Sequence, residues 1–518
     1  MFRRLILAAL LAASGAAQAQ LPEALTRLLR TAGIPDDAVG IVVQRGATTL
    51  VSHGAERVMQ PASTIKLVTT LVALEQLGPA FRTRTELRTD AELVQGVLQG
   101  ALYLRGGADP DFNEDVLGHM LQALRNQGIR HIQGDIVLDR QLFQPARTDV
   151  DALPFDEFPM AYYNVIPDAL LINNNLLKVE LRSSASKLDL VMMPELENVG
   201  IRAEMRLIDG PCARWEEGWK PAMIARKGEH IDLVLRGTFP RNCIRSNSVN
   251  LLDRNEYLGR LLRASWRKLG GTMSGVVREA GPIAGMGAYA GSATVAGTAG
   301  TSAPAPAAAN AVPVTGRLLA EHVSRSLPEI VRDTNKFSDN VMARTLFLSL
   351  GSLEGDTLLG SHPLPPDGSG LSTNARADQA IRAWFQRQHI DTQGLVMENG
   401  SGLSRLERIR PAQMAALLQA GLASPWAPEF MASLPIASVD GTMRKRMKDS
   451  AAAMRARLKT GSLNGVVAMA GYVMDANNQP CVVVGIINHE LVTNGSGRVV
   501  LDALVDWVAR SGAPSPVP

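Results

Sequence analysis

The spacing of apolar residues predicts a domain core close to the start of the chain. The stretches 40–45 and 48–52 are rich in Val, Ile, Leu and Thr and flank Gly46, which predicts two strands joined by a tight turn. The stretch from Thr64 to Leu77 is apolar on nearly every face and is followed by Gly78-Pro79, which ends a helix. Because a helix that is hydrophobic all round belongs inside a domain, we expect this helix to be buried.

The last third of the chain has equally strong patterning. From Val314 onward the periodicity predicts helices, and further along it predicts strands at Val466–Met474 and Cys481–Ile487. Residues Val499–Arg510 predict a helix that closes the chain.

The middle of the chain, from about residue 86, alternates short strands, loops and helices. The expected helices Val116–Asn126 and Glu256–Lys268 each run into a glycine and then a short strand. This similarity suggests two halves of one domain. Residues 287–312 are mainly Ala, Gly, Ser, Thr and Pro, without charge or periodicity, which predicts a flexible loop or linker.

Residues 1–19 predict a signal peptide. Arg3 and Arg4 precede the short apolar stretch Leu5–Ala13, and Ala17-Gln18-Ala19 supplies a small-x-small cleavage signal. A buried N-terminal helix is the alternative, which the order of these three parts disfavours. No other stretch is long and apolar enough to span a bilayer. We therefore expect a soluble periplasmic protein without a transmembrane anchor.

Length, charge and cysteine content indicate how many domains, which partners and which disulfides to expect. A chain of 518 residues is too long for one core and predicts two or three domains. The net charge of +3 falls to +1 once the two arginines of the signal peptide are removed, so we expect no nucleic-acid partner. Cys212 and Cys243 share one polar, loop-rich region and are the disulfide candidate, whereas Cys481 heads an apolar run and is expected to be a free buried thiol. No Cys or His spacing matches a metal-ligand pattern, so no metal is expected.

The strongest candidate for a nucleophile is Ser63, three residues before Lys66. Residues i and i+3 share a helix face, which places an amine beside a serine hydroxyl that needs a base. Ser-x-x-Lys also occurs at Ser184 and Ser265, so the motif alone does not choose. Only Ser63 opens an apolar helix, where a dry setting lowers the pKa of the lysine.

Two further motifs complete a candidate site. Ser-x-Asn occurs four times, and Ser338-Asp339-Asn340 is favoured because it lies at the start of an expected helix; the other copies begin at Ser248, Ser372 and Ser462. Lys459-Thr460-Gly461 occurs once and precedes an apolar strand, as an edge strand beside a site requires. Its lysine adds positive charge that keeps a neighbouring lysine neutral, and Gly461 leaves room for a substrate backbone.

Together, Pro61–Lys66, Ser338–Asn340 and Lys459–Gly461 resemble the motifs of penicillin-binding proteins and serine β-lactamases. The gap of 275 residues from position 63 to position 338 is far longer than in β-lactamases. It resembles the class C low-molecular-mass group, the penicillin-binding protein 4 type D-alanyl-D-alanine carboxypeptidase/endopeptidase. The long Ala- and Gly-rich stretch at 287–312 departs from this pattern.

The resemblance implies a multi-domain α/β fold. Its catalytic domain, an antiparallel sheet flanked by helices, would comprise residues 20–85 and 314–518. A large mixed α/β insertion at 86–313 would interrupt it, with a smaller nested domain at about 165–245.

Other segments extend the resemblance over nearly the whole mature chain. They include residues 105–110, 399–405 and 434–442, and the positions of Cys212 and Cys243 also resemble a cysteine pair of the inserted region. Residues 367–372 mimic the Gly-Ser-Gly-Leu-Ser part of residues 399–405, but no arginine follows them. We therefore interpret the earlier copy as a coincidental loop.

The resemblance also implies the chemistry. Ser63 would attack the bond between two D-alanines of a peptidoglycan stem peptide, Lys66 would take its proton, and Ser338 with Lys459 would protonate the leaving amine. Substrate would be bound by Asn340, Lys459 and Thr460, and the backbone N–H groups of Ser63 and Ser462 would form the oxyanion hole. No cofactor is implied, and β-lactams would be covalent inhibitors. The alternatives are a serine β-lactamase and a catalytically silent wall-binding protein on the same fold; the oligomeric state stays open.

Overall fold

The computed structural model describes residues 20–150, 152–281, 316–365 and 368–512. The chain forms two compact units and passes between them four times. Unit 1 comprises Met1–Pro79, Ser326–Gly351 and Ala377–Pro518, and unit 2 comprises Ala80–Arg325 and Ser352–Arg376. The expected signal peptide at 1–19 and the expected linker at 287–312 lie outside the described residues.

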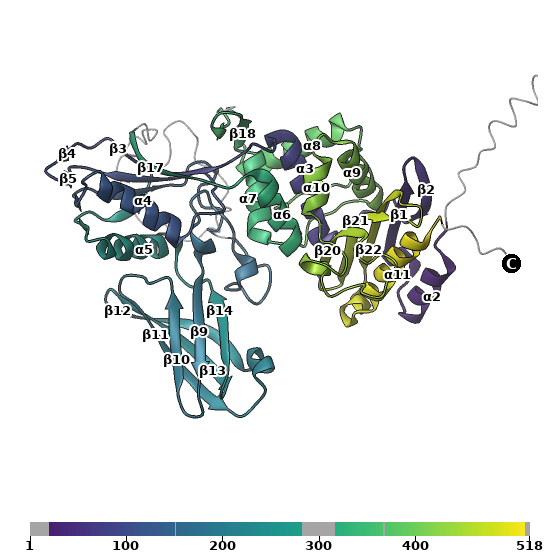
Figure 1. The fold of residues 1–518 in the computed structure, drawn as a ribbon, viewed down its shortest axis with the longest axis horizontal. Helices are drawn as coiled ribbons and strands as arrows, with labels where there is room; N and C mark the ends of the chain where they lie inside the picture. The colour runs from purple at the N-terminus through teal and green to yellow at the C-terminus, as the bar shows by residue number, and fades with distance from the viewer. Residues whose placement is uncertain (1–19, 151, 282–315, 366–367, 513–518) are drawn as a thin grey trace, which may run out of the picture. The chain divides into compact units, whose positions relative to one another are not determined.

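Unit 1 is built on a five-stranded antiparallel sheet (Figure 1). The first strand pairs with the second strand on one side and with the last strand of the chain on the other, where Val43 lies opposite Val483. The strand order is β2 (Thr48–His53), β1 (Val39–Arg45), β22 (Pro480–Asn488), β21 (Val466–Met474) and β20 (Ala456–Leu463). Strands β21 and β22 are buried at nearly every position, which explains their almost continuous runs of apolar residues.

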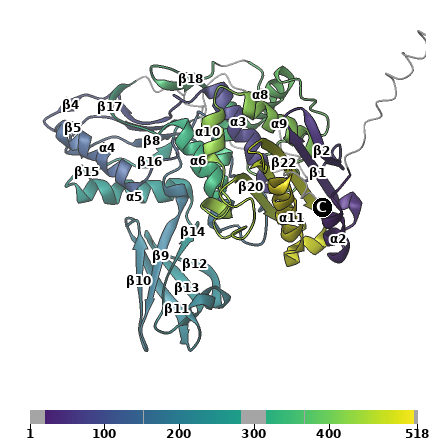
Figure 2. The same ribbon diagram turned by 45° about the vertical axis from the view of Figure 1, so that its right-hand side comes forward.

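Helices cover both faces of this sheet (Figures 1 and 2). On one face α11 (Ser496–Arg510) and α2 (Glu23–Thr31) pack against alternate strand residues such as Val43, Met469 and Val483. The other face carries α9 (Pro411–Ala423), to which the Tyr472 hydroxyl donates a hydrogen bond at the Leu418 carbonyl. Because successive strand residues point to opposite faces, one apolar strand contributes side chains to the contacts with the helices on both faces.

The helix expected from Thr64 to Leu77 is the centre of a helical layer in unit 1. A 3₁₀ turn at Ala62–Ile65 leads into α3 (Lys66–Leu77), which is buried at every position except Glu75 and Gln76. Its neighbours are α6 (Leu327–Phe337), α7 (Asn340–Leu350) and α10 (Ala427–Ser433). The prediction of a helix that is buried on all sides is therefore confirmed.

Unit 2 contains two small mixed sheets and two helices, α4 (Glu114–Asn126) and α5 (Arg254–Lys268). One sheet has the order β16 (Val277–Glu279), β8 (Ile136–Asp139), β6 (Leu102–Gly106), β3 (Arg84–Thr89) and β17 (Arg317–Val323). The other has the order β15 (Thr272–Met273), β7 (His131–Ile132), β5 (Val97–Leu98) and β4 (Leu93–Val94).

The internal similarity seen in the sequence has a structural counterpart. After α4 come β7 and β8, and after α5 come β15 and β16. The second pair of strands lies parallel to the first, with Thr272 opposite His131 and Val277 opposite Ile136. The two helix–strand–strand segments thus lie side by side in the same two sheets.

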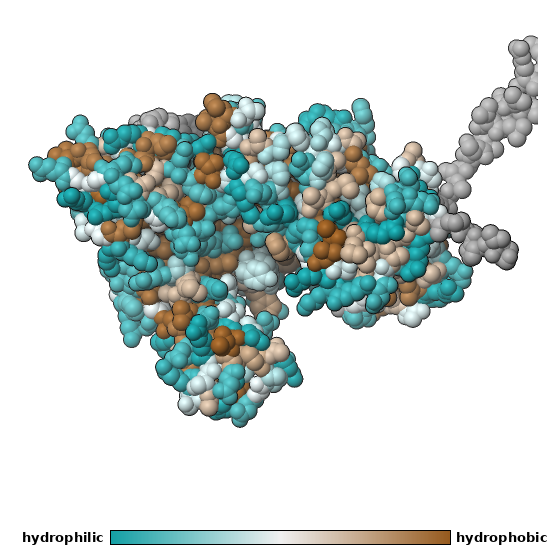
Figure 3. Space-filling model, in the orientation of Figure 1, coloured by the Kyte–Doolittle hydropathy of each residue, from teal (hydrophilic) through white to brown (hydrophobic). Residues whose placement is uncertain are grey.

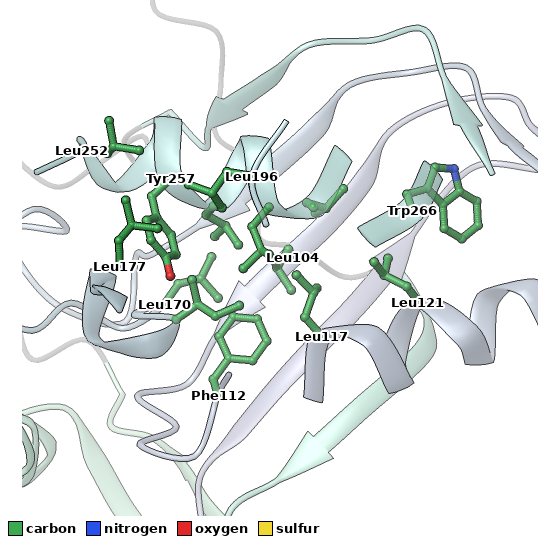
Figure 4. Packing of buried hydrophobic residues seen from close by; sticks show 14 of the residues in the cluster. Leu104, Phe112, Leu117, Leu121, Leu170, Leu177, Leu196, Leu252, Tyr257 and Trp266 are labelled. Carbon is green, nitrogen blue, oxygen red and sulfur yellow. The ribbon is translucent and has the colours of Figure 1, made fainter. Parts of the chain in front are cut away.

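The nested region of unit 2 is all β. One sheet has the order β10 (Leu188–Met193), β9 (Leu177–Ser183) and β14 (Ile244–Val249), and the other β11 (Val199–Ile208), β13 (His230–Pro240) and β12 (Trp219–Lys227). Its apolar residues join one cluster with those of α4 and α5, part of which Figure 4 shows. That shared core includes Leu104, Leu117, Leu177 and Tyr257.

The borders of the compact units differ from the predicted domain edges at 85/86 and 313/314. Strands β3 and β17 pair antiparallel, with Arg84 opposite Val323, so both belong to unit 2. The hairpin of β18 (Leu353–Asp356) and β19 (Gly360–Pro363) also belongs to unit 2, where the Ser361 hydroxyl donates to the Arg82 carbonyl. Helix α8 (Thr373–Arg387) then crosses from unit 2 into unit 1.

The surface and the helices of the described residues can be compared with the expectation that the protein has no transmembrane anchor. Hydrophilic residues predominate on the face that Figure 3 shows, and apolar residues form small groups among them. Across the described ranges, every helix is too short or too polar to cross a bilayer.

Candidate active site

Ser63 lies on the 3₁₀ turn that precedes α3. Ala62 has a φ of +46°, a conformation that L-residues adopt rarely, and the Thr64 hydroxyl donates to the Pro61 carbonyl at 2.7 Å. The chain therefore turns sharply at Ser63 and enters the helix at Lys66. The Lys66 Nζ lies 3.2 Å from the Ser63 Oγ, as the i, i+3 spacing predicts.

The amine of Lys66 is fully buried and is surrounded by oxygen atoms. Besides the Ser63 Oγ, it contacts the Asn340 Oδ1 at 2.7 Å and the Ser401 carbonyl oxygen. Burial lowers the pKa of Lys66 from 10.5 to about 7; the charges of Glu407 and Asp339 oppose this change, and that of Arg344 assists it. About half of the Lys66 side chains are therefore neutral near pH 7.

The Ser-x-Asn motif lies at the junction of two helices. Ser338 ends α6 in a left-handed conformation with a φ of +59°, and Asp339 caps α7 by accepting the Met342 N–H at 2.9 Å. This tight junction places the Ser338 hydroxyl near Lys459 and the Asn340 amide beside Lys66.

The Lys-Thr-Gly motif lies on β20, which is the edge strand of the sheet in unit 1. The buried Lys459 Nζ donates to the Ser338 Oγ and to the Thr460 carbonyl, both at 2.8 Å. Burial holds the pKa of Lys459 well below its usual value, and the charge of Lys66 lowers it further. The Thr460 hydroxyl donates to the Thr442 Oγ1 at 2.9 Å, and Ser462 is exposed.

Gly461 brings this edge strand against the nucleophile. A Cβ atom at Gly461 would lie 2.9 Å from the Pro61 carbonyl oxygen and 3.0 Å from the Ser63 nitrogen. Any larger residue would therefore push β20 away from Ser63. The three motifs thus meet at one site within unit 1, as the sequence predicts.

A fourth segment, residues 399–405, also reaches the site. Its Ser401 carbonyl accepts from Lys66, and a Cβ atom at Gly402 would lie only 2.2 Å from the Ala62 carbonyl oxygen. The resemblance named this segment without giving it a role, and Glu407 was not among the predicted site residues. The Glu407 carboxylate accepts three backbone N–H groups of the segment. Nothing in the local sequence distinguishes Glu407 from an ordinary charged residue.

Lys336 and the 434–442 segment, which the resemblance named without a role, form a second group of contacts at the site. The Lys336 Nζ donates to the Asp440 carboxylate at 2.6 Å and to the Leu434 carbonyl at 2.8 Å. The Asp440 carboxylate also accepts the Ile436 N–H at 2.8 Å, so it holds the 436–442 loop that carries Thr442. These contacts set the position of the Thr442 hydroxyl beside Thr460.

Most of the rejected motif copies belong to unit 2, whereas the copy at Ser462 lies on β20 in unit 1. Ser184 is exposed in the turn between β9 and β10, where its hydroxyl accepts the Lys187 N–H, and Ser265 lies inside α5. The described part of the 367–372 segment belongs to unit 2. None of these three segments belongs to unit 1, which holds Ser63 and Lys459.

The cysteines occupy two different settings. Cys212 and Cys243 form a disulfide with Cα atoms 5.4 Å apart, which links the 3₁₀ segment Cys212–Gly218 to the start of β14. Cys481 is buried and unpaired on β22, and burial raises the pKa of its thiol. The expectation of a free buried thiol is therefore confirmed.

A serine beside a buried amine, faced by a second serine–lysine pair, is the arrangement of a serine acyl-transfer hydrolase. Comparison with known proteins identifies the family. The sequence profile of the D-Ala-D-Ala carboxypeptidase 3 (S13) family matches residues 21–290 and 293–511. The chain belongs to this family, and it is a serine-type D-Ala-D-Ala carboxypeptidase by class. The predicted enzyme class is confirmed.

Individual relatives agree with this assignment. The chain is 27% identical over 485 residues to a D-alanyl-D-alanine carboxypeptidase of Actinomadura sp. (strain R39), covering 90% of this chain and 80% of the relative. It is 24% identical over 452 residues to the D-alanyl-D-alanine carboxypeptidase DacB of Haemophilus influenzae, covering 85% and 82%. The crystal structure of penicillin binding protein 4 from H. influenzae matches with a TM-score of 0.69 at 22% identity, covering 93% and 99%. That structural match confirms the predicted fold class.

Proposed function

We propose that the protein cleaves the terminal D-alanine from peptidoglycan stem peptides in the periplasm through an acyl-enzyme on Ser63. The observation that carries the proposal is the setting of Lys66. A neutral amine has two N–H groups and one lone pair. With the N–H groups donated to the Asn340 amide oxygen and the Ser401 carbonyl, the lone pair is left for the Ser63 hydroxyl at 3.2 Å. The amine is therefore oriented to act as a general base.

In the first step Lys66 takes the Ser63 proton while the Ser63 Oγ bonds to the carbonyl carbon of the penultimate D-alanine. The carbonyl oxygen becomes an oxyanion, to which the backbone N–H groups of Ser63 and Ser462 would donate. The close approach of Gly461 to the Ser63 nitrogen supports this role, because Ser462 directly follows Gly461 on the same strand.

In the second step the carbon–nitrogen bond breaks and the departing D-alanine amine needs a proton. The Ser338 hydroxyl, hydrogen-bonded to Lys459 at 2.8 Å, would relay to this amine the proton that Lys66 took from Ser63, which returns Lys66 to its neutral form. The Lys459 amine and the Thr460 hydroxyl would donate to the terminal carboxylate, and Asn340 would bind the substrate backbone. Water then hydrolyses the acyl-enzyme with Lys66 as base, which returns the Ser63 hydroxyl.

The same serine would acylate with β-lactams, and we propose that it also opens crosslinks between stem peptides. One of the solved relatives is penicillin binding protein 4 of H. influenzae complexed with a β-lactam, at a TM-score of 0.65. An endopeptidase reaction breaks the same type of bond, with a crosslinked stem as leaving group in place of free D-alanine.

Labelling with a fluorescent penicillin tests the proposal, with Ser63→Ala compared with Ser265→Ala. Ser265 also begins a Ser-x-x-Lys motif, so it is a matched control that lies in unit 2. We expect wild type and Ser265→Ala to be labelled and Ser63→Ala to remain unlabelled. Label on Ser63→Ala, or none on wild type, would reject the assignment. Free D-alanine and opened crosslinks, measured on defined muropeptides, then separate the two peptidase activities.

A further inference from the structure

Glu407 is a fully buried carboxylate that binds three backbone donors of one loop. Its Oε1 accepts the N–H groups of Asn399 and Gly400 at 3.1 and 2.7 Å, and its Oε2 accepts that of Gly402 at 2.8 Å. Three N–H donors around one carboxyl group favour its ionised form, which accepts with both oxygens. The loop from Asn399 to Gly402 is therefore folded around a single buried charge.

This loop holds the beginning of the nucleophile helix at two points. The Ser401 carbonyl accepts from the Lys66 amine, and the Gly400 carbonyl accepts from the Thr69 hydroxyl at 2.7 Å. Gly402 lies directly against the Ala62 carbonyl. A shift of the loop would therefore move an acceptor of Lys66, and the direction of the amine relative to Ser63 would change.

The charge of Glu407 also acts on Lys66 across this short distance. The charged groups that influence the pKa of Lys66 are Glu407 and Asp339, which are negative, and Arg344, which is positive. Lys459 is a second buried amine, and its own pKa is lowered by burial and by Lys66. Among the charges, that of Glu407 does most to raise the pKa of Lys66 against the larger effect of burial. Burial raises the pKa of Glu407 itself, while the backbone donors and Lys66 oppose that change.

We propose that Glu407 is a positioning residue for acylation: it fixes the Asn399–Gly402 loop and, through the Ser401 carbonyl, the amine of Lys66. The inference rests on the proposed role of Ser63 and Lys66. It adds a residue that touches neither the substrate nor the nucleophile. Its consequence is that one side chain affects both the position of the base and its pKa.

Three variants separate this role from general support of the fold. Glu407→Gln keeps the size and removes the charge, whereas Glu407→Asp keeps the charge on a shorter side chain. Ser401→Ala is the matched control without a charge change, because the Ser401 hydroxyl donates to the Asn399 side chain at 2.6 Å and accepts the Leu403 N–H at 3.2 Å within the same loop. The readout is the second-order rate of acylation by a fluorescent penicillin between pH 5 and 9, together with thermal unfolding.

We expect Glu407→Gln to acylate on the order of tenfold or more slowly at pH 8, where the base is neutral in both proteins. The acid limb of its profile should move to lower pH, because the charge that raises the pKa of Lys66 is gone. Glu407→Asp and Ser401→Ala should lose rate while keeping the wild-type midpoint. Wild-type rates and midpoint in Glu407→Gln would overturn the inference, as would an equal midpoint shift in Ser401→Ala.

If Glu407→Gln does not fold, Glu407→Asp decides the positioning role. A reduced rate at an unchanged midpoint supports it, and a wild-type rate overturns it. These outcomes differ from failure of the proposed function, which would appear as wild-type protein that takes no label or as label on Ser63→Ala.

Discussion

The pKa of Lys66 leads to a pH dependence that can be worked out in advance. An exposed lysine with a pKa of 10.5 is neutral in about one molecule in three thousand at pH 7. With a pKa of about 7, the neutral fraction is about one half at pH 7 and about one hundredth at pH 5. If neutral Lys66 is the base for Ser63, the acylation rate should follow this fraction.

The expected result is therefore a roughly fiftyfold fall in the acylation rate between pH 7 and pH 5, with a half-maximal rate near pH 7. Stopped-flow measurement with a penicillin that carries no titrating group in this range reports the rate directly. Unfolding must be followed in parallel, so that loss of structure at low pH is not counted as loss of the base. A rate that is constant from pH 5 to pH 7 in folded protein would refute the assignment of Lys66 as the titrating base.

Two further variants test the packing of the glycine loop beside Ser63 and the disulfide of unit 2. Gly402→Ala should reduce the acylation rate on the order of a hundredfold, because its Cβ would lie 2.2 Å from the Ala62 carbonyl oxygen and its φ is +84°. Gly118→Ala in α4 is the control, because a Cβ atom there would have no atom within 4 Å. Comparable acylation rates in the two variants would contradict the argument. Cys212→Ser with Cys243→Ser should lower the free energy of unfolding of unit 2 by about 2–4 kcal/mol, because the bond closes a long loop. In denaturant titration of that double variant, penicillin labelling should persist, since Ser63 lies in unit 1; loss of labelling in still folded protein would contradict this separation.

The three motifs could be found from the sequence because each is short and its context is local. The dry helix after Ser63 selected it over Ser184 and Ser265, and the structure places the Lys66 amine at the expected distance. The edge position of Lys459 also followed from the sequence, because the apolar strand β21 comes directly after it. The local sequence was sufficient at these positions, because the site residue and the apolar residues that position it lie in the same segment of the chain.

Contacts between distant segments could not be predicted in the same way. The Ser401 carbonyl meets Lys66 across 335 positions of the chain, and a backbone carbonyl has no sequence signature. In the sequence, Glu407 is an ordinary charged residue in a polar stretch. Only the fold brings the backbone N–H groups of the 399–402 loop around its carboxylate. The unit borders differed for a similar reason, since the pairing of β3 with β17 joins residues on both sides of a long insertion.

The central claim is that Ser63 carries the acyl group. Intact-mass analysis of the protein after reaction with a penicillin, followed by peptide mapping, measures this directly. We expect one adduct per chain, located on the peptide that contains Ser63, and no adduct on the Ser63→Ala variant. An adduct located on any other peptide, with the Ser63 peptide unmodified, would contradict it.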